Sequence, residues 1–404
     1  MIVVQINETC GTGSIGRSAE ELAVHLEQTG NTAYVFYASG HPTFSKAERI
    51  GGAWAQKLHA LLSRVTGLQG YFSVRPTLRL VKRLREIGPD IVHLQNLHAN
   101  YINLRILLRY LAKHDVATVI TLHDCWFYTG KCTYYVAAGC QKWQQECGHC
   151  PLLHKDNINP TFFFDRTKKC LRDKKTWLDA IPRLAVIGVS EWVANEAKHS
   201  ILGVREPVCI YNWIDAELFH PCDTSALRKK LQLQGKFVVL MVTANISANK
   251  GYGVLCELAR VSNENWQLII VGKNSAKLQI PNNVIHIAHT NDAHELAEYY
   301  SMADVCVNTT RFETFGKVTA EALCCGTPVI VYNNTASPEL VEDGCGYVVE
   351  EESGINGIVI AIQAIQNKGK QAFTQKCVSS AQGRFDKKKG IEKYMQLYKS
   401  LQGR

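Results

Sequence analysis

The chain has 404 residues, of which 46% are hydrophobic, and it carries a net charge of +9. This length exceeds one ordinary domain and suits two domains of about 150–200 residues each. The first residues lack the charged and apolar regions of a secretion signal, and no apolar stretch reaches the roughly 18 residues of a membrane-spanning helix. We therefore expect a protein that is cytoplasmic or peripheral at the inner face of a membrane, with anionic ligands, anionic lipid or nucleic acid as candidate partners.

Short apolar runs alternate with helical stretches along the whole chain. The first series of expected strands covers residues 2–7, 33–38, 90–95, 117–123 and 183–190. The second series covers residues 236–243, 266–273, 283–288, 304–310 and 328–333. Gly, Pro, Asn or Asp bounds each run, and helical stretches separate most of them. The pattern predicts an α/β fold with two parallel sheets, each connected by crossover helices.

A polar stretch near residues 205–235 separates the two series. We predict an N-terminal domain over 1–205, a C-terminal domain over 206–385 and a last helical segment over 386–404 that could pack back toward the N-terminal domain. The N-terminal domain would include a cysteine-rich insert at 132–150.

Residues 11–17, GTGSIGR, contain the G-x-G-x-x-G spacing of a dinucleotide-binding turn. Two features count against an NAD-dependent oxidoreductase: residues 8–10 separate the strand from the first glycine, and the second strand ends without an acidic residue to hold a ribose. Two interpretations remain for this stretch. Either Gly13 and Gly16 let a ligand approach backbone N–H groups at a helix start, or the stretch is a tight turn without a ligand.

The segment 304–349 carries the most specific signal. A strand leads into the loop RFETFG, a helix over about 316–325 and a further strand. Three backbone N–H groups at the helix start suit an anion, namely those of Phe315, Gly316 and Lys317. Glu313 precedes the helix and Glu321 lies on it, and carboxylates hold vicinal diols through strong charge-assisted hydrogen bonds. A nucleoside diphosphate-sugar combines these features, because two diols flank its diphosphate.

The succession E-T-F-G-x-x-x-x-E-A, C-G-T-P-V-I and S-P-E-L-V resembles the E-x7-E signature of retaining glycosyltransferase family 4. Similar segments recur along nearly the whole chain: PDIVHLQN, TLHD, VSEWV, YNWIDAELFHP and the Lys-Gly pair at 250–251. The resemblance implies the GT-B fold, in which two Rossmann-like domains with parallel sheets face each other across a cleft. It also implies that the nucleotide-sugar donor, linked to GDP or UDP, binds the C-terminal domain.

The resemblance assigns roles to individual residues. Glu313 would hold the sugar hydroxyls, Glu321 the ribose diol, and His123 would point toward the transferred sugar. The implied phosphate contacts are Phe315, Gly316, Lys317 and Lys250, with Gly13 and Gly16 approaching the donor phosphate or the acceptor.

One position departs from the family pattern. The family usually has Gly-Arg before the Lys-Gly pair, and here Ala244 and Asn245 stand in that place. Asn245 would then contact the donor, and Lys250, Arg311 or Lys317 would supply the missing positive charge. The chain has no D-x-D pair to hold a metal-bound diphosphate, so we expect catalysis without a metal cofactor, with transfer at retained configuration and electrostatic stabilisation of the leaving diphosphate.

Four of the fifteen cysteines form a cluster with the spacing C-x7-C-x6-C-x2-C: Cys132, Cys140, Cys147 and Cys150. Four thiolates with one C-x2-C pair can hold a tetrahedral structural zinc ion, although this spacing is not that of a standard zinc finger. Packed free thiols and disulfide or redox chemistry remain open alternatives. Similar inserts occur in family members that resemble colanic acid and O-antigen assembly enzymes.

Residues 75–88 predict a basic amphipathic helix with Leu80, Val81, Leu84 and Ile87 on one face. Such a helix could lie on an anionic membrane, or its apolar face could pack on the sheet. A membrane contact would agree with a lipid-linked acceptor, an oligosaccharide on undecaprenyl diphosphate.

We therefore expect a retaining glycosyltransferase of bacterial surface polysaccharide assembly, for example of O-antigen, capsule or exopolysaccharide. The alternatives are a GT-B enzyme with a soluble acceptor, a sugar-nucleotide epimerase, and an NAD-dependent oxidoreductase. Nucleic acid is not an expected partner, because only Lys131 and Lys142 lie within the cysteine cluster.

Overall fold

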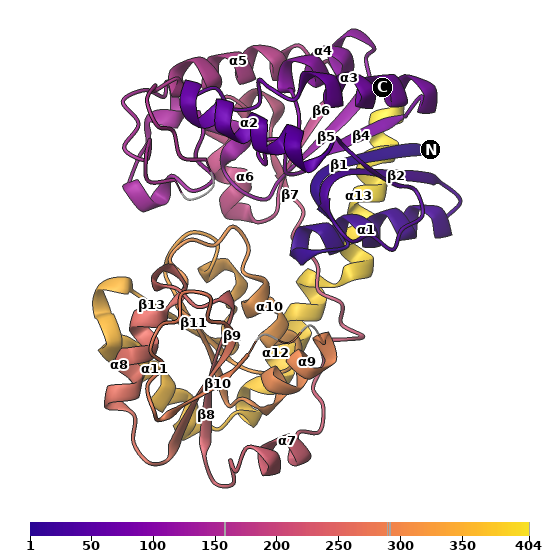
Figure 1. The fold of residues 1–404 in the computed structure, drawn as a ribbon. Helices are drawn as coiled ribbons and strands as arrows, with labels where there is room; N and C mark the ends of the chain where they lie inside the picture. Colours follow the sequence, from indigo (N-terminus) through magenta and orange to yellow (C-terminus); the bar gives the residue numbers. More distant parts are fainter. Residues whose placement is uncertain (157–158, 289, 291, 404) are drawn as a thin grey trace. The chain divides into compact units, whose positions relative to one another are not determined.

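The computed structural model describes residues 1–156, 159–288, 290 and 292–403. It divides into two compact units (Figure 1): Met1–Ile210 with Ile391–Arg404 form unit 1, and Tyr211–Gly390 form unit 2. Most of the last helix, α13 (Lys387–Gln402), therefore belongs to unit 1. No helix in the described part of the chain is long and apolar enough to cross a membrane.

Unit 1 is built on a seven-stranded parallel sheet with the strand order β3-β2-β1-β4-β5-β6-β7. Its strands are β1 (Ile2–Cys10), β2 (Thr32–Gly40), β3 (Ala47–Arg49), β4 (Ile91–Leu94), β5 (Ala117–Leu122), β6 (Leu184–Gly188) and β7 (Val208–Cys209). Its other helices are α1 (Gly13–Gln28), α2 (Ala53–Thr66), α3 (Val74–Ile87), α4 (Leu104–Lys113), α5 (Thr167–Asp179) and α6 (Glu191–Lys198). Strands β4 and β5 are buried along their whole length, as expected for the centre of a parallel sheet covered on both faces.

Unit 2 contains a six-stranded parallel sheet with the order β10-β9-β8-β11-β12-β13. Its strands are β8 (Phe237–Asn245), β9 (Trp266–Lys273), β10 (Val284–Ile287), β11 (Val305–Asn308), β12 (Val329–Tyr332) and β13 (Gly346–Val349). Its helices are α7 (Ser225–Lys230), α8 (Tyr252–Val261), α9 (Ala293–Met302), α10 (Lys317–Cys324), α11 (Gly354–Lys368) and α12 (Gln371–Phe385). The two expected series of strands are thus confirmed as two parallel sheets.

Three strands and one strand end differ from the sequence prediction. The short strands β3, β7 and β13 were not predicted, because they have two to four residues and lie at sheet edges. Strand β1 continues to Cys10, where Thr9 and Cys10 pair with Ser39 and Gly40 of β2. The first glycine therefore follows the strand directly, and the spacing argument against a dinucleotide turn was wrong. The other argument against a dinucleotide turn still holds, because β2 ends without an acidic residue that could hold a ribose.

Each sheet has one point at which the order of its strands reverses direction. In unit 1 this point lies between β1 and β4, and in unit 2 it lies between β8 and β11. The loops that leave the carboxyl ends of two such neighbouring strands diverge to opposite sides of the sheet and leave a crevice, where ligands bind in open α/β folds. The topology therefore indicates where each unit would hold a ligand.

Helix α13 is fixed in unit 1 by buried polar side chains. His93 on β4 hydrogen-bonds the Tyr398 hydroxyl and the Thr121 hydroxyl, each at 2.7 Å. The Thr121 hydroxyl also hydrogen-bonds that of Tyr394 at 2.8 Å. Burial lowers the pKa of His93 to about 3, so its ring is neutral and serves as a hydrogen-bonding link between the sheet and this helix.

The predicted basic helix 75–88 corresponds to α3, and its apolar face is not available to a membrane. Leu80, Val81 and Leu84 are buried in unit 1. The basic side chains therefore lie on the outer face of an ordinary surface helix, and the membrane interpretation of this apolar face was wrong.

Candidate functional site

The reversal point of the unit 2 sheet brings two predicted site residues together. Lys250 follows β8 in a short turn, and Glu313 lies in the loop after β11. Because β8 and β11 are neighbours, the Lys250 ammonium comes within 3.0 Å of the Glu313 Oε1 atom. Both side chains keep some exposure, 41% for Lys250 and 19% for Glu313. This pair places a positive and a negative group at the edge where the topology predicts a ligand.

The loop that carries Glu313 is held by its own backbone. The Glu313 N–H donates to the Thr335 hydroxyl at 3.0 Å, and its carbonyl accepts the N–H of Ala336 at 3.2 Å. At the start of the loop, Thr310 donates to the Asn308 side chain at 2.7 Å. These bonds hold the backbone of the loop at Glu313 in place before any ligand arrives, and catalytic groups need such preorganisation.

Helix α10 begins directly after this loop. Gly316 is its N-cap residue and has a φ of +94°, a conformation that strains any residue with a side chain. The Phe315 side chain is buried against Tyr211 and Phe385, so only its backbone could meet a ligand. The first backbone N–H groups of an α-helix have no hydrogen-bond acceptor within the helix. In α10 these N–H groups follow directly after the loop that carries Glu313.

Glu321 lies one turn further along α10 and is half-buried. The Tyr300 hydroxyl donates to its Oε2 atom at 2.9 Å. Sequence reasoning missed Tyr300, which is fully buried on α9. A hydroxyl anchored in the core therefore fixes one oxygen of this carboxylate.

Asn245 stands where the family usually has an arginine, and both Asn245 and the nearby candidate Arg311 already have interaction partners. Asn245 is exposed at the end of β8, and its Oδ1 atom accepts the N–H of Ser275 at 3.1 Å. Arg311, one suggested source of positive charge, pairs with Glu351 at 2.7 Å. Lys250, another of the suggested cations, is tied to the Glu313 loop by its ion pair with Glu313.

Three buried polar groups around this loop have no hydrogen-bond partner among the described residues: the Thr309 hydroxyl, the Asn334 side-chain amide and the Ser337 hydroxyl. Asn334 accepts the Ser337 N–H, and Ala336 between them bonds Glu313. Buried polar groups in folded proteins are almost always hydrogen-bonded. These side chains, which the sequence prediction did not include, are therefore suited to bind a polar ligand or ordered water.

The predicted glycines of unit 1 lie at the start of α1 and differ in surroundings. Gly13 has a φ of +69°, and a Cβ atom there would meet nothing within 4 Å. A Cβ atom on Gly16 would lie 2.7 Å from the Thr9 hydroxyl oxygen. Close packing on β1 thus explains Gly16, whereas Gly13 leaves open space beside the backbone.

Predicted His123 belongs to a buried polar cluster at the reversal point of the unit 1 sheet. It follows β5, and its Nε2 atom lies 3.1 Å from the Gln95 Oε1 atom. Beside it, the His98 Nε2 atom lies 2.8 Å from the Asp124 Oδ2 atom, and both side chains are more than 90% buried. Sequence reasoning missed His98 and Asp124, although each comes soon after a predicted strand, which was the available signal.

The charges of this cluster shift the pKa values of its members. Burial would lower the pKa of His98, but the charge of Asp124 and the hydrogen bond to it outweigh burial, and the net pKa is raised. Burial would likewise raise the pKa of Asp124, yet His98 holds it below its usual value. Burial raises the pKa of Glu8, at the end of β1. Such perturbed groups are typical of functional sites.

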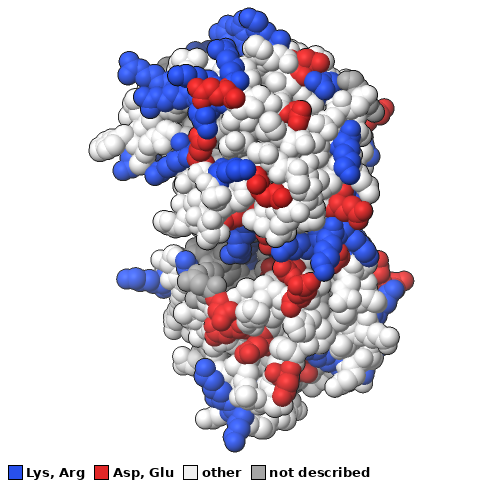
Figure 2. Space-filling view, turned by 90° about the vertical axis from the view of Figure 1, so that its right-hand side faces the viewer, with Lys and Arg blue, Asp and Glu red and all other residues white. Residues whose placement is uncertain are grey.

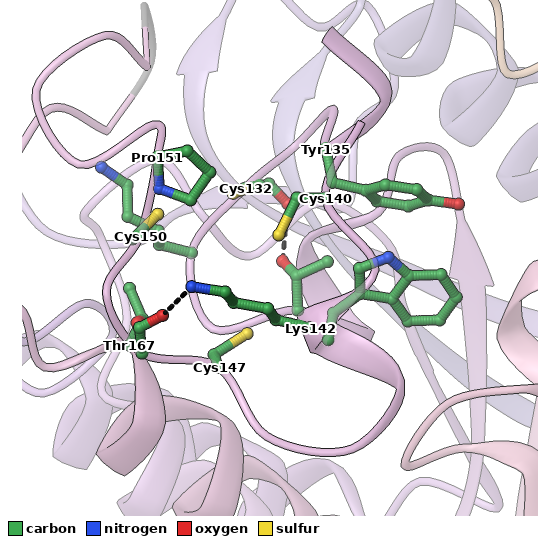
Figure 3. A pocket seen from close by; sticks show the side chains of 12 residues that line it. Cys132, Tyr135, Cys140, Lys142, Cys147, Cys150, Pro151 and Thr167 are labelled. Carbon is green, nitrogen blue, oxygen red and sulfur yellow. Dashed lines mark hydrogen bonds between the residues drawn. The ribbon is translucent and has the colours of Figure 1, made fainter. Parts of the chain in front are cut away.

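The four clustered cysteines line one small cavity of about 20 Å³ in unit 1 (Figure 3). All fifteen cysteines are free thiols. In the described part of the chain, no three Cys, His, Asp or Glu side chains already stand at metal-binding distances from one another.

Comparisons with known proteins match both units. The description "Glycosyltransferase Family 4" matches residues 15–218, and "Glycosyl transferases group 1" matches residues 223–376. A protein of Escherichia coli K12, named as the putative colanic acid biosynthesis glycosyl transferase WcaC, is 26% identical over 425 residues, which cover 99% of this chain and 100% of that protein.

Solved structures share the fold over the whole chain. Sucrose-phosphate synthase from Thermosynechococcus elongatus has a TM-score of 0.72 at 17% identity and covers 99% of both chains. HepE from Anabaena in complex with UDP has a TM-score of 0.69 at 18% identity and covers 99% of this chain and 100% of its own. The predicted fold class is thereby confirmed. The chain belongs to glycosyltransferase family 4 and is a glycosyltransferase with the GT-B fold.

Proposed function

We propose that this enzyme transfers a sugar, with retention of anomeric configuration, from a UDP- or GDP-linked donor to a lipid-linked oligosaccharide of bacterial surface polysaccharide assembly. The observation that carries the proposal is the Lys250–Glu313 pair at the reversal point of the unit 2 sheet, 3.0 Å apart. The names of the related proteins support the donor and the pathway, since WcaC is named for colanic acid biosynthesis and HepE was solved with UDP.

In this proposal each group of the unit 2 site meets one part of the donor. Glu313 accepts hydrogen bonds from the sugar hydroxyls, and Glu321, oriented by Tyr300, accepts them from the ribose diol. Lys250 and the N–H groups of Phe315, Gly316 and Lys317 face the diphosphate, with Asn245 at the rim. Their positive charge stabilises the leaving diphosphate, so transfer is expected to proceed without added metal ions.

The unit 1 groups complete the assignment. His123 contacts the transferred sugar, and the open backbone at Gly13, together with Gly16, takes a phosphate of the donor or a part of the acceptor. No covalent nucleophile is assigned; the departing diphosphate takes the acceptor proton on the face from which it leaves.

Replacing Glu321 with glutamine is expected to weaken UDP or GDP binding about 10–100-fold, because hydrogen bonds to a charged group contribute about 1.5–3 kcal/mol. Isothermal titration calorimetry would measure this. Inorganic pyrophosphate, which has no ribose, should bind both forms equally, and Glu298→Gln on the exposed face of α9 is the matched control. Equal nucleotide affinity of the wild type and the Glu321 variant would exclude the ribose contact.

A surface of unit 1 suits the membrane contact that a lipid-linked acceptor requires. Trp54, Leu58 and Leu61 occupy one face of α2 and are 84%, 57% and 54% exposed. Residues 162–164, three phenylalanines that are each about half exposed or more, adjoin the end of this helix, since the Phe162 N–H donates to the Arg64 carbonyl at 2.7 Å. We call these six side chains the α2 surface.

Basic side chains border the α2 surface. The Lys57 ammonium lies 5.4 Å from the Trp54 ring centroid, and the Arg166 guanidinium lies 5.7 Å from that of Phe164. Lys and Arg side chains also gather at the uppermost end of unit 1 on the face drawn in Figure 2, which is the right-hand side of Figure 1, whereas α2 lies toward the left of Figure 1. Exposed aromatic and leucine side chains flanked by cations match an interface with anionic lipid.

Vesicle sedimentation tests the α2 surface. The wild-type chain should bind vesicles of phosphatidylglycerol and phosphatidylethanolamine at low salt, and the double variant Trp54→Ser/Phe163→Ser should bind at least about tenfold more weakly, because apolar area is lost from the lipid contact. Val204→Ser replaces an equally exposed apolar residue elsewhere in unit 1 and should have no effect. A wild-type chain that stays in the supernatant would contradict the membrane contact.

A transfer assay tests the whole proposal. The full chain is incubated with radiolabelled UDP- and GDP-sugars and with bacterial membranes, and the label is followed into solvent-extractable lipid. Metal-independent label in the lipid fraction is the expected result, and nuclear magnetic resonance of the product would give the anomeric configuration. Label only in a soluble product would assign a soluble acceptor instead.

A further inference from the structure

One segment of unit 1, residues 125–166, has no role in the proposed transfer reaction. In its described residues it contains three single-turn 3₁₀ helices and no strand or α-helix. Yet Tyr128, Tyr135 and Trp143 within it are buried and in ring contact. A segment this long without a hydrogen-bonded ladder needs another source of order.

The four cysteines lie together at the centre of this segment. They line the same cavity as Lys131, Lys142 and Thr167. Figure 3 shows the side chains of Cys140, Cys147 and Cys150 directed into the space that the Lys142 side chain crosses. Sulfur atoms from two separate turns and from the C-x2-C pair therefore line one space, which already accommodates a cationic side chain.

Two buried lysines lie near the cavity that the four cysteines line. Lys131 and Lys174 are each only 2% exposed. Lys131 donates to the Leu153 carbonyl at 2.7 Å, and Lys174 donates to the Trp126 carbonyl at 2.5 Å. Neither lysine forms an ion pair with a carboxylate among the described residues, and buried charges are normally paired. Two buried ammonium groups near the cysteines are thus hydrogen-bonded to backbone carbonyls and form no ion pair among the described residues.

We propose that Cys132, Cys140, Cys147 and Cys150 bind one structural zinc ion. Four thiols each lose a proton and form a bond to Zn²⁺, giving a tetrahedral centre with a net charge of −2. The ammonium groups of Lys131 and Lys174 balance this charge. The Gly130 N–H, which donates to the Cys147 Sγ atom at 3.3 Å, is a backbone donor of the kind that orients metal ligands.

The zinc centre would stabilise the part of unit 1 that holds the His123 cluster. Lys174 bonds the Trp126 carbonyl, and the Trp126 N–H donates to the Asp124 side chain at 2.8 Å. The centre is thereby linked to the residues that follow β5, although it touches none of the groups assigned to sugar transfer.

Metal analysis of the full chain, purified under reducing conditions without chelator, tests this proposal independently of activity. One zinc per chain is expected, together with the charge-transfer and ligand-field absorption of a tetrahedral tetrathiolate after exchange into Co²⁺. Zinc loss to a strong chelator should lower the midpoint of thermal unfolding by several degrees. A folded chain without zinc, or one whose four cysteines are found in disulfides, would overturn the proposal.

A matched pair of variants assigns the ligands. Cys147→Ser should lose most of the bound zinc, whereas Cys170→Ala should retain it, because Cys170 is buried in the neighbouring helix α5 and its thiol bonds the Gly67 carbonyl. If the Cys147 variant does not fold, the cobalt spectrum of the wild-type chain still decides between a four-sulfur centre and other ligands. Equal zinc in both variants would exclude Cys147 as a ligand.

Discussion

Replacing Glu313 with alanine is expected to lower kcat of sugar transfer by about 10²–10³-fold, equivalent to about 2.7–4 kcal/mol, the size of one preorganised electrostatic contact. The Glu313 backbone is held by hydrogen bonds to Thr335 and Ala336, and its carboxylate lies 3.0 Å from the Lys250 ammonium. Its loss would remove the acceptor for the sugar hydroxyls and leave Lys250 without its partner. The measurement is steady-state kinetics with the donor identified by the transfer assay.

The matched control for this prediction is Glu264→Ala. Glu264 is exposed just before β9, at the opposite end of the same sheet, and its replacement should leave kcat unchanged. The urea unfolding midpoints of both variants should equal that of the wild type, because Glu313 is a partly exposed loop residue. Near-normal turnover by the Glu313 variant would show that this carboxylate has no part in catalysis.

Replacing His98 with glutamine is expected to lower the free energy of unfolding by about 3–5 kcal/mol near pH 6, because it leaves the buried Asp124 charge without its partner. His98 has a raised pKa in the folded chain. Its protonation therefore stabilises the fold fully below the unfolded value of about 6.5, and this contribution is lost as pH rises through the folded pKa. The cost of the substitution should accordingly shrink as pH rises through the folded pKa of His98.

Protonation of Asp124 removes the stabilisation by the His98–Asp124 pair at low pH. Its folded pKa is lowered, so its contribution is present above the unfolded value of about 3.9 and is lost as pH falls through the folded pKa. Urea unfolding at several pH values would measure both limits. His114→Gln, at an exposed helix end, should change stability by less than about 0.5 kcal/mol. A cost that does not vary with pH would mean that His98 is neutral in the folded chain.

The fold could be predicted from the sequence because parallel strands that are buried on both faces are continuous apolar runs. The ATVITL run of β5, for example, is buried at every residue. The edge strands β3, β7 and β13 were not predicted, because they are too short to form a recognisable apolar run. Strand β1 was predicted too short because the polar Glu8 and Thr9 break the apolar run, although Thr9 and Cys10 still pair with β2 at the carboxyl end.

Only part of the candidate site could be predicted, namely the part whose residues lie close together in the sequence. Glu313, Gly316 and Glu321 lie within one short segment, so their spacing is visible in the sequence. Tyr300, Thr335 and the His98–Asp124 pair reach their partners only through tertiary packing. The exposed apolar face of α2 was missed in favour of α3, because the sequence shows amphipathic periodicity in both helices but not which face the core covers.

Thermal unfolding of the wild-type chain with UDP, GDP, ADP and NAD, each without and then with added divalent metal, tests the central claim most directly. A ligand at about 100 times its Kd stabilises the native state by about 2.7 kcal/mol, which is an easily measured shift. The account predicts that UDP or GDP raises the unfolding midpoint without metal and that NAD does not. A shift with NAD alone would assign the glycine-rich turn after β1 to a dinucleotide and would contradict the donor site proposed at Glu313, Glu321 and Lys250.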